Sequence, residues 1–139
     1  MRHPGISQLH MWDIAGDTWA QPRYVWSWAD GRAETPLESR VRLRCLDDGL
    51  VPDDLQVEVH DEHARLLARA DMTFRRRDPD ALPLILEADG RGPHDSPDAV
   101  YRDRWRANAL VALGYVLVRC TWSDTVSRLA VPTMVRRAL

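Results

Sequence analysis

Three stretches of the chain have the hydrophobic patterns of β-strands. Residues 55–59 alternate apolar with polar positions, which is typical of a half-buried strand. Residues 66–74 follow a polar turn and are predicted to pair with the first stretch as a hairpin. After a polar connection, the apolar run at 82–87 predicts a third strand, which leads into Ala88-Asp89-Gly90.

Two helices are predicted from their start and stop residues. The segments 35–49 and 96–114 each open with a Thr or Ser cap followed by proline, and each closes at glycine. The first also carries Glu38 three residues after its cap, which completes a capping box. The second places four apolar residues roughly along one side: Tyr101, Trp105, Ala109 and Leu113.

The remaining segments complete a mixed α/β architecture. Residues 115–121 are apolar on both faces apart from Arg119, so we expect a strand at the centre of the sheet. From about Asp124 the chain is predicted to be helical, with Pro132 restarting the helix. The order helix, three strands, helix, strand, helix predicts an α+β fold with a mixed sheet flanked by helices, because a hairpin precedes a strand-helix-strand crossover.

The length and composition are those of one ordinary domain. With 139 residues, of which 45% are hydrophobic, we expect residues 29–139 to form a single core, preceded by a tryptophan-rich segment, 1–28, of little readable pattern. No apolar run approaches a membrane span and no signal-peptide pattern is present, so we expect a cytoplasmic protein without membrane contact. Cys45 and Cys120 are expected to be buried free thiols, since neither has a Cys or His at metal-ligand spacing.

The charge pattern leaves nucleic-acid binding open. The formal net charge of −2 argues against a surface coated in positive potential. All 19 basic residues are arginine, which excludes any mechanism that needs lysine. Arginines cluster at 40–44, 75–77, 102–106 and 136–137, where they either form a basic stripe or lie on solvated faces of helices and loops.

Three acids are predicted to meet at the ends of neighbouring strands. Glu87 and Asp89 leave the third strand on the same side, about 7 Å apart along the backbone, because strand side chains alternate faces. Asp71 lies in an otherwise apolar strand, where a carboxylate is costly unless it is paired or bound to a cation. If the two strands pair, the acids suit Mg²⁺ or Mn²⁺ rather than zinc.

Each acid taken alone also has a structural explanation. Asp71 can form an ion pair with Arg69 or Arg119. The pair Asp89-Gly90 is an ordinary turn signal, and Glu38 is accounted for by its capping box. The joint placement of the acids is therefore what favours a functional site.

These residues and their order resemble a known nuclease family. The chain is similar to the very-short-patch-repair endonuclease-like branch of the PD-(D/E)XK superfamily, and more closely to the actinobacterial proteins filed as an endonuclease-like domain of unknown function. The resemblance covers Ala29 to the C-terminus. It is carried by Glu38, Asp71, Glu87-x-Asp89-Gly90, His94, Arg102-Asp103-Arg104-x-Arg106-x-Asn108 and Leu113-Gly114-Tyr115-x-Leu117-x-Arg119.

The resemblance implies a restriction-endonuclease-like core and a role for each matching residue. Asp71 matches the central metal-binding aspartate, and Glu38 matches the acid on the first helix. Glu87 and Asp89 occupy the two ends of the third-strand motif, with Asp89 standing where lysine is usual. His94 matches the histidine near the scissile phosphate. No structural zinc is expected, because its Cys and His positions hold other residues here: Arg91, Ser96 and Asp98.

The function that follows is a metal-dependent DNA endonuclease acting in repair or defence. A Mg²⁺ or Mn²⁺ ion held by Asp71 and the third-strand acids would bind a phosphate oxygen and lower the pKa of an attacking water, with His94 transferring a proton. The phosphate would be held by arginine. The alternative is a catalytically weak nucleic-acid-binding module of a toxin-antitoxin-like or regulatory system, acting with a partner protein or as a homodimer. The phosphate-binding candidates are Arg102, Arg106 and Arg119.

Overall fold

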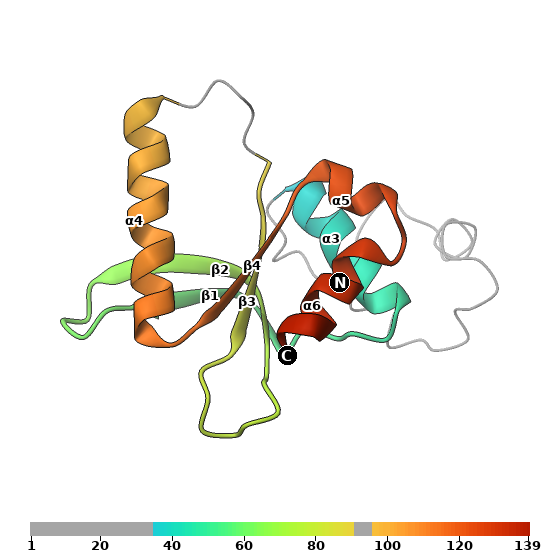
Figure 1. The fold of residues 1–139 in the computed structure, drawn as a ribbon, viewed down its shortest axis with the longest axis horizontal. Helices are drawn as coiled ribbons and strands as arrows, with labels where there is room; N and C mark the ends of the chain where they lie inside the picture. Colours follow the sequence, from blue (N-terminus) through green and yellow to red (C-terminus); the bar gives the residue numbers. More distant parts are fainter. Residues whose placement is uncertain (1–34, 91–95) are drawn as a thin grey trace, which may run out of the picture. The chain divides into compact units, whose positions relative to one another are not determined.

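The computed structural model describes residues 35–90 and 96–139, which belong to one structural unit. The described residues form four strands and four helices, which Figure 1 labels. In chain order the elements are α3 (Pro36–Asp47), β1 (Asp54–His60), β2 (Leu66–Phe74), β3 (Leu84–Ala88), α4 (Pro97–Leu113), β4 (Val116–Cys120), α5 (Trp122–Val126) and α6 (Ala130–Ala138).

The strands form one mixed sheet in the order β1-β2-β3-β4. β1 pairs antiparallel with β2, β2 pairs antiparallel with β3, and β3 pairs parallel with β4 through the crossover helix α4. The predicted α+β class is confirmed, and so is the predicted element order, except that two helices, α5 and α6, follow the fourth strand in place of one. The predicted central place of the fourth strand is wrong, because β4 is at an edge of the sheet formed by the described strands. Its side chains are apolar on both faces because α4 and α6 both contact it.

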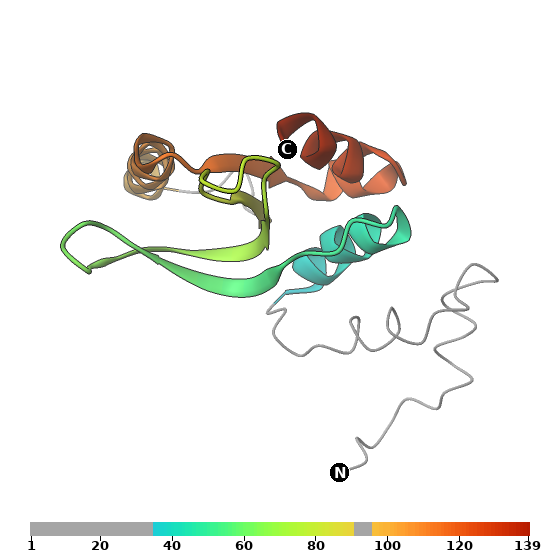
Figure 2. The ribbon, with the colours of Figure 1, turned by 90° about the horizontal axis from the view of Figure 1, so that it is seen from below.

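Helices lie on both sides of the β3–β4 pair. Figures 1 and 2 show α4 on one side and the group α3, α5 and α6 on the other; the view of Figure 2 is turned by a quarter turn from that of Figure 1. The larger core cluster joins α3 and α6 to the sheet around Val41, Met72 and Leu86. A smaller cluster joins α4 to the sheet through Leu110 and Ile85. The sheet is therefore packed against helices on both of its faces.

Helix ends form as their sequence signals predict. The Thr35 side chain accepts a hydrogen bond from the amide of Glu38 at 3.2 Å, and Ser96 caps α4 through the amide of Ala99 at the same distance. Gly114 ends α4 with φ of 105°, a left-handed conformation in which only glycine is unstrained. These local contacts fix where α3 and α4 begin and hence which of their residues face the sheet.

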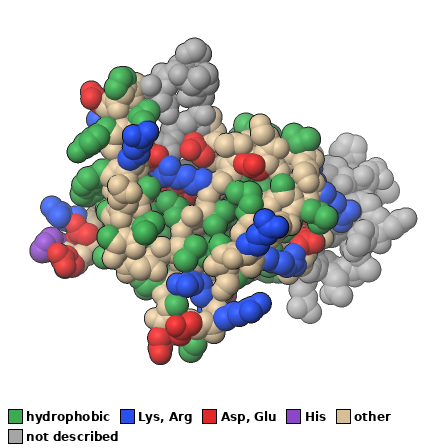
Figure 3. All heavy atoms as spheres, viewed as in Figure 1, with side chains coloured by type: hydrophobic (Ala, Val, Ile, Leu, Met, Phe, Trp, Pro, Cys, Tyr) green, Lys and Arg blue, Asp and Glu red, His purple; other side chains and the backbone are tan. Residues whose placement is uncertain are grey.

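The long helix α4 presents most of its apolar side to solvent. Leu110 is its buried residue, whereas Tyr101 and Trp105 are 71% and 58% exposed. Hydrophobic side chains are visible on the outer side of this helix in Figure 3. Asp103 and Arg106 of α4 are only partly exposed and form ion pairs with each other, with Glu87 of β3 and with Arg119 of β4.

The remaining predictions on composition concern cysteines and membranes. Cys45 and Cys120 are free thiols and both are buried, as expected. Burial raises the pKa of each thiol to about 12. No helix in the described ranges has the length and apolar content that crossing a bilayer requires.

Candidate functional site

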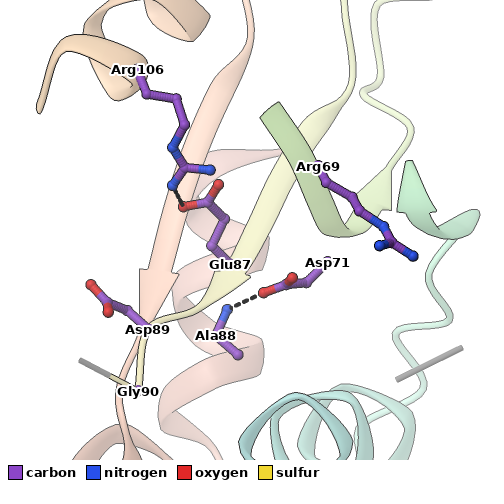
Figure 4. A pocket seen from close by; sticks show the side chains of 7 residues that line it. All are labelled: Arg69, Asp71, Glu87, Ala88, Asp89, Gly90 and Arg106. Carbon is purple, nitrogen blue, oxygen red and sulfur yellow. Dashed lines mark hydrogen bonds and ion pairs between the residues drawn. The ribbon is translucent and has the colours of Figure 1, made fainter. Parts of the chain in front are cut away.

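A pocket opens where the pairing of β2 and β3 ends. The register of these strands runs as far as Met72 and Leu86, and the residues beyond them separate. The resulting cavity has a volume of about 220 Å³ and is lined by the three acids Asp71, Glu87 and Asp89, together with Arg69 and Arg106 (Figure 4). The three carboxylates that the strand pattern predicted to meet therefore border one cavity.

Asp71 is fixed to the neighbouring strand through its carboxylate. Its Oδ2 accepts a hydrogen bond from the backbone amide of Ala88 at 2.8 Å, as Figure 4 shows. The pKa of this carboxyl is raised to about 6, first by burial and then by the negative charges of Glu38 and Glu87, while the Ala88 amide and Arg106 act in the opposite direction. Asp71 is thus an acid held beside other acids.

Glu38 lies close enough to Asp71 to influence its charge, and it is itself held on two sides. Its Oε1 accepts from the Thr35 hydroxyl at 3.2 Å, and its Oε2 accepts from Nε2 of Gln56 at 2.8 Å. Only 7% of Glu38 is exposed. Glu38 thus lies at the capped end of α3, where its carboxylate contacts the Thr35 hydroxyl, and its buried negative charge acts on Asp71.

Gln56 occupies an unusual backbone conformation opposite Asp71. Its neighbours Leu55 and Val57 pair with Met72 and Ala70, so Gln56 of β1 lies opposite Asp71 of the adjacent strand β2. Its φ is 54°, in the left-handed region that residues other than glycine rarely adopt. Strained residues of this kind tend to cluster at functional sites.

Glu87 is the centre of a network of ion pairs. Its Oε2 accepts from a terminal nitrogen of Arg106 at 3.0 Å and from Nε of Arg119 at 3.1 Å. Asp103 of α4 accepts from both terminal nitrogens of Arg119, at 2.6 and 3.1 Å, and from Arg106 at 3.1 Å. Two of the three arginines predicted to bind phosphate thus contact acids of the protein.

The second oxygen of Glu87 has no such contact. Oε1 is buried and has no hydrogen-bond partner within the described residues. A buried carboxylate oxygen without a partner is costly, because it has lost water and gained nothing in exchange. Since Glu87 lines the pocket, a rotation of its carboxylate would bring Oε1 to a ligand in this cavity.

The donor set fits a hard divalent cation in its chemistry, since it offers carboxylate oxygens, one of them unsatisfied. The side chains are not gathered into a complete coordination sphere: across 35–90 and 96–139, no group of three or more His, Cys, Asp or Glu residues is arranged to hold a metal ion. A cation at this site would therefore require carboxylates to turn toward it.

The other candidates are distributed as follows. Arg119 forms an ion pair with Glu87, which lines the pocket. Arg102 is exposed on α4 and does not line the pocket. His94 lies outside the described residues. Sequence reasoning gave no role to Gln56 or Asp103. The spacing of Asp103 and Arg106, three residues apart on a helix, was the available signal for the second, while Gln56 looked like an ordinary polar strand position.

Comparisons with known proteins identify similar sequences of unknown activity. The chain is 34% identical over 102 residues to an uncharacterized protein of Mycobacterium tuberculosis strain CDC 1551 / Oshkosh, and equally to one of strain ATCC 25618 / H37Rv. Each match covers 73% of this chain and 35% of the relative, so the chain spans about a third of the length of the curated relatives it matches. No family model matches the chain. No solved structure matches it either.

Proposed function

We propose that the protein is a metal-dependent endonuclease that hydrolyses phosphodiester bonds of DNA, acting in repair or defence inside the cell. The observation that carries the proposal is the unsatisfied Oε1 of Glu87, buried in a pocket beside the carboxylates of Asp71 and Asp89. The pKa of Asp71 is raised first by burial and then by the negative charges of Glu38 and Glu87, so its ionised form is unfavourable without a cation. Such an arrangement gains stability when a cation binds.

Asp71, Glu87 and Asp89 are the residues that would hold Mg²⁺ or Mn²⁺. When bound, such an ion supplies positive charge that polarises a phosphate oxygen and lowers the pKa of a water molecule. Asp71 contributes a carboxylate whose position is fixed by the Ala88 amide. Asp71 must be ionised for this role, so the proton and the cation compete for its carboxylate, and the raised pKa of Asp71 means that a lower pH weakens cation binding.

Arginine supplies the positive charge that a phosphate group requires. Arg69 and Arg106 both line the cavity, so a phosphate that enters it lies near two basic side chains. We assign the proton transfer to His94, which follows Asp89 by five positions in the sequence. Asp89 stands where lysine is usual in the resembling family, and the arginines supply the missing positive charge.

The topology also supports this assignment. The order α3, β1, β2, β3, α4, β4 and the sheet order β1-β2-β3-β4 are those expected for a restriction-endonuclease-like core. In such a core the acids come from the first helix and from the second and third strands. Glu38, Asp71 and Glu87 have these positions, which is why we propose the finer fold together with the function.

A second candidate function is a nucleic-acid-binding module with weak catalysis, which acts with a partner protein or as a homodimer. One observation favours it: Arg106 and Arg119 both form ion pairs with Glu87. These ion pairs compensate the negative charge of Glu87, which a cation would otherwise bind. In this alternative, DNA binds at the arginines and the carboxylates have a structural role.

Cleavage of plasmid and oligonucleotide DNA distinguishes the two candidates. The wild type is expected to cleave in Mg²⁺ or Mn²⁺, and Asp71→Asn is expected to lose at least about a hundredfold in rate, since it removes a charged group from the site. Asp80→Asn is the matched control, because Asp80 is exposed in the connection between β2 and β3. DNA binding without cation-dependent cleavage in the wild type supports the second candidate. Equal cleavage by wild type and Asp71→Asn refutes the first.

A further inference from the structure

Asp103 holds both of the arginines that contact Glu87. Its two oxygens accept from the two terminal nitrogens of Arg119, and one of them also accepts from Arg106. The Asp103 and Glu87 side chains are 14% and 8% exposed, so water competes little for these contacts. Asp103 does not line the pocket. Its influence on the pocket must therefore pass through the arginines.

Arg119 divides its donors between two acids. Nε donates to Oε2 of Glu87, and the terminal nitrogens donate to Asp103. A guanidinium group and a carboxylate prefer a fork of two parallel hydrogen bonds, which engages both carboxylate oxygens. In this structure Asp103 takes the fork of Arg119. Glu87 is consequently bound at Oε2, and Oε1 has no hydrogen bond within the described part of the chain.

We infer that Asp103 is a positioning residue that keeps Oε1 of Glu87 available to a divalent cation, by holding Arg119 in the fork that would otherwise close on Glu87. The inference rests on the proposed function, because it assigns Oε1 to the cation. Among the contacts of the described residues, the network joins two acids to two arginines. Removing the charge of Asp103 leaves an excess positive charge beside Glu87 and releases two donors that can cover Oε1. Both changes oppose a cation.

The test is a titration of the full chain with Mn²⁺, in which binding is measured by electron paramagnetic resonance. Asp103→Asn is expected to weaken Mn²⁺ binding about tenfold, which is the effect of one charge-assisted contact. Asp98→Asn is the matched control, because it removes the same charge from an exposed position on the same helix and is expected to bind like the wild type. Asp103→Glu restores the charge and is expected to recover most of the affinity.

Cleavage kinetics separate positioning from a general structural effect. In Asp103→Asn the Mn²⁺ concentration for half-maximal cleavage is expected to rise about tenfold, while kcat at saturating Mn²⁺ stays within about twofold of the wild type, because the reacting groups are intact. A loss of kcat with unchanged Mn²⁺ dependence contradicts the inference. If Asp103→Asn fails to fold by circular dichroism, Arg119→Lys is the second test: lysine keeps the charge but cannot form the fork that would cover Oε1, so Mn²⁺ affinity is expected to stay within about twofold of the wild type, and a tenfold loss contradicts the inference.

The outcomes distinguish this inference from the proposed function. A wild type that does not bind Mn²⁺ overturns the proposed function, and the inference with it. A wild type that binds Mn²⁺ and an Asp103→Asn variant that binds it equally well overturn the inference alone. Weaker binding by Asp103→Asn, with Asp98→Asn unchanged, is the result that supports it.

Discussion

The carboxylate of Asp71 on β2 accepts a hydrogen bond from the backbone amide of Ala88 on β3, with 2.8 Å between Oδ2 and N. The strand pairing has ended at Met72 and Leu86, so this side chain satisfies an amide beyond the last paired residues. The strands are thus joined by a side chain at the point where the pocket begins. Asp71 is held rigidly in a place where its negative charge is unfavourable, which is typical of a functional acid.

The first prediction concerns the stability of the cation-free protein as a function of pH. The pKa of Asp71 is raised from 3.8 to about 6, so the folded state binds this proton more tightly than the unfolded state. The resulting stabilisation is fully present below about pH 4 and is lost as pH rises through about 6. Asp71→Asn has no such proton, and it is expected to be more stable than the wild type above pH 6 by about 1 kcal/mol, allowing for partial solvent screening.

Urea unfolding in the presence of EDTA measures this difference. The advantage of Asp71→Asn at about pH 7.5 is expected to shrink as pH falls toward about 4, where the wild-type carboxyl is protonated. Asp80→Asn serves again as the exposed control. Parallel stability curves for wild type and Asp71→Asn across this range would show that burial does not shift the titration of Asp71.

Much of the fold was predictable because its signals are local. The caps Thr35 and Ser96 and the terminal Gly114 act on their own helices, and the structure uses them as the sequence indicates. The position of β4 was not predictable in the same way. An apolar pattern on both faces of a strand predicts that both faces are covered, and α4 and α6 do contact β4. The pattern does not reveal whether a further strand pairs with the outer edge of β4, and in the described sheet none does.

In the candidate site, too, the features that depend on local sequence were predictable and those that depend on distant residues were not. The meeting of Asp71 with Glu87 and Asp89 follows from hairpin topology and from the two-residue period of a strand, so the sequence predicted their proximity. The arginine contacts of Glu87 join residues on β3, α4 and β4, and long-range ion pairs leave no pattern in the sequence. The left-handed backbone of Gln56 likewise depends on its surroundings, since glutamine has no preference for that conformation.

The second prediction tests the role of Gln56. Its amide donates to Glu38 at 2.8 Å, and its φ of 54° is strained for glutamine. Gln56→Asn is expected to change the free energy of unfolding by less than about 1 kcal/mol, because asparagine tolerates the left-handed region but its shorter side chain loses a single hydrogen bond.

Cation-dependent cleavage by Gln56→Asn is nevertheless expected to fall about tenfold, because Glu38 loses the donor that orients it beside Asp71. Gln56→Gly relieves the backbone strain and also removes the amide, so it is expected to show the same loss of cleavage. Wild-type cleavage by both variants would show that the contact between Gln56 and Glu38 is structural alone.

The last prediction uses a buried thiol to detect opening of the site. Burial raises the pKa of Cys120 to about 12, so the native thiol is expected to react with a thiol reagent at about pH 8 far more slowly than an unfolded one. The carbonyl of Cys120 accepts a hydrogen bond from the amide of Asp89 at 2.7 Å. An opening that exposes Cys120 therefore also displaces Asp89.

In a Cys45→Ala background, which leaves one thiol, Mg²⁺ is expected to slow the labelling of Cys120 several-fold by stabilising the closed state. The same addition is expected to have no effect when Asp71→Asn is also present, and slowing of equal size in both proteins would place the Mg²⁺ effect outside the pocket.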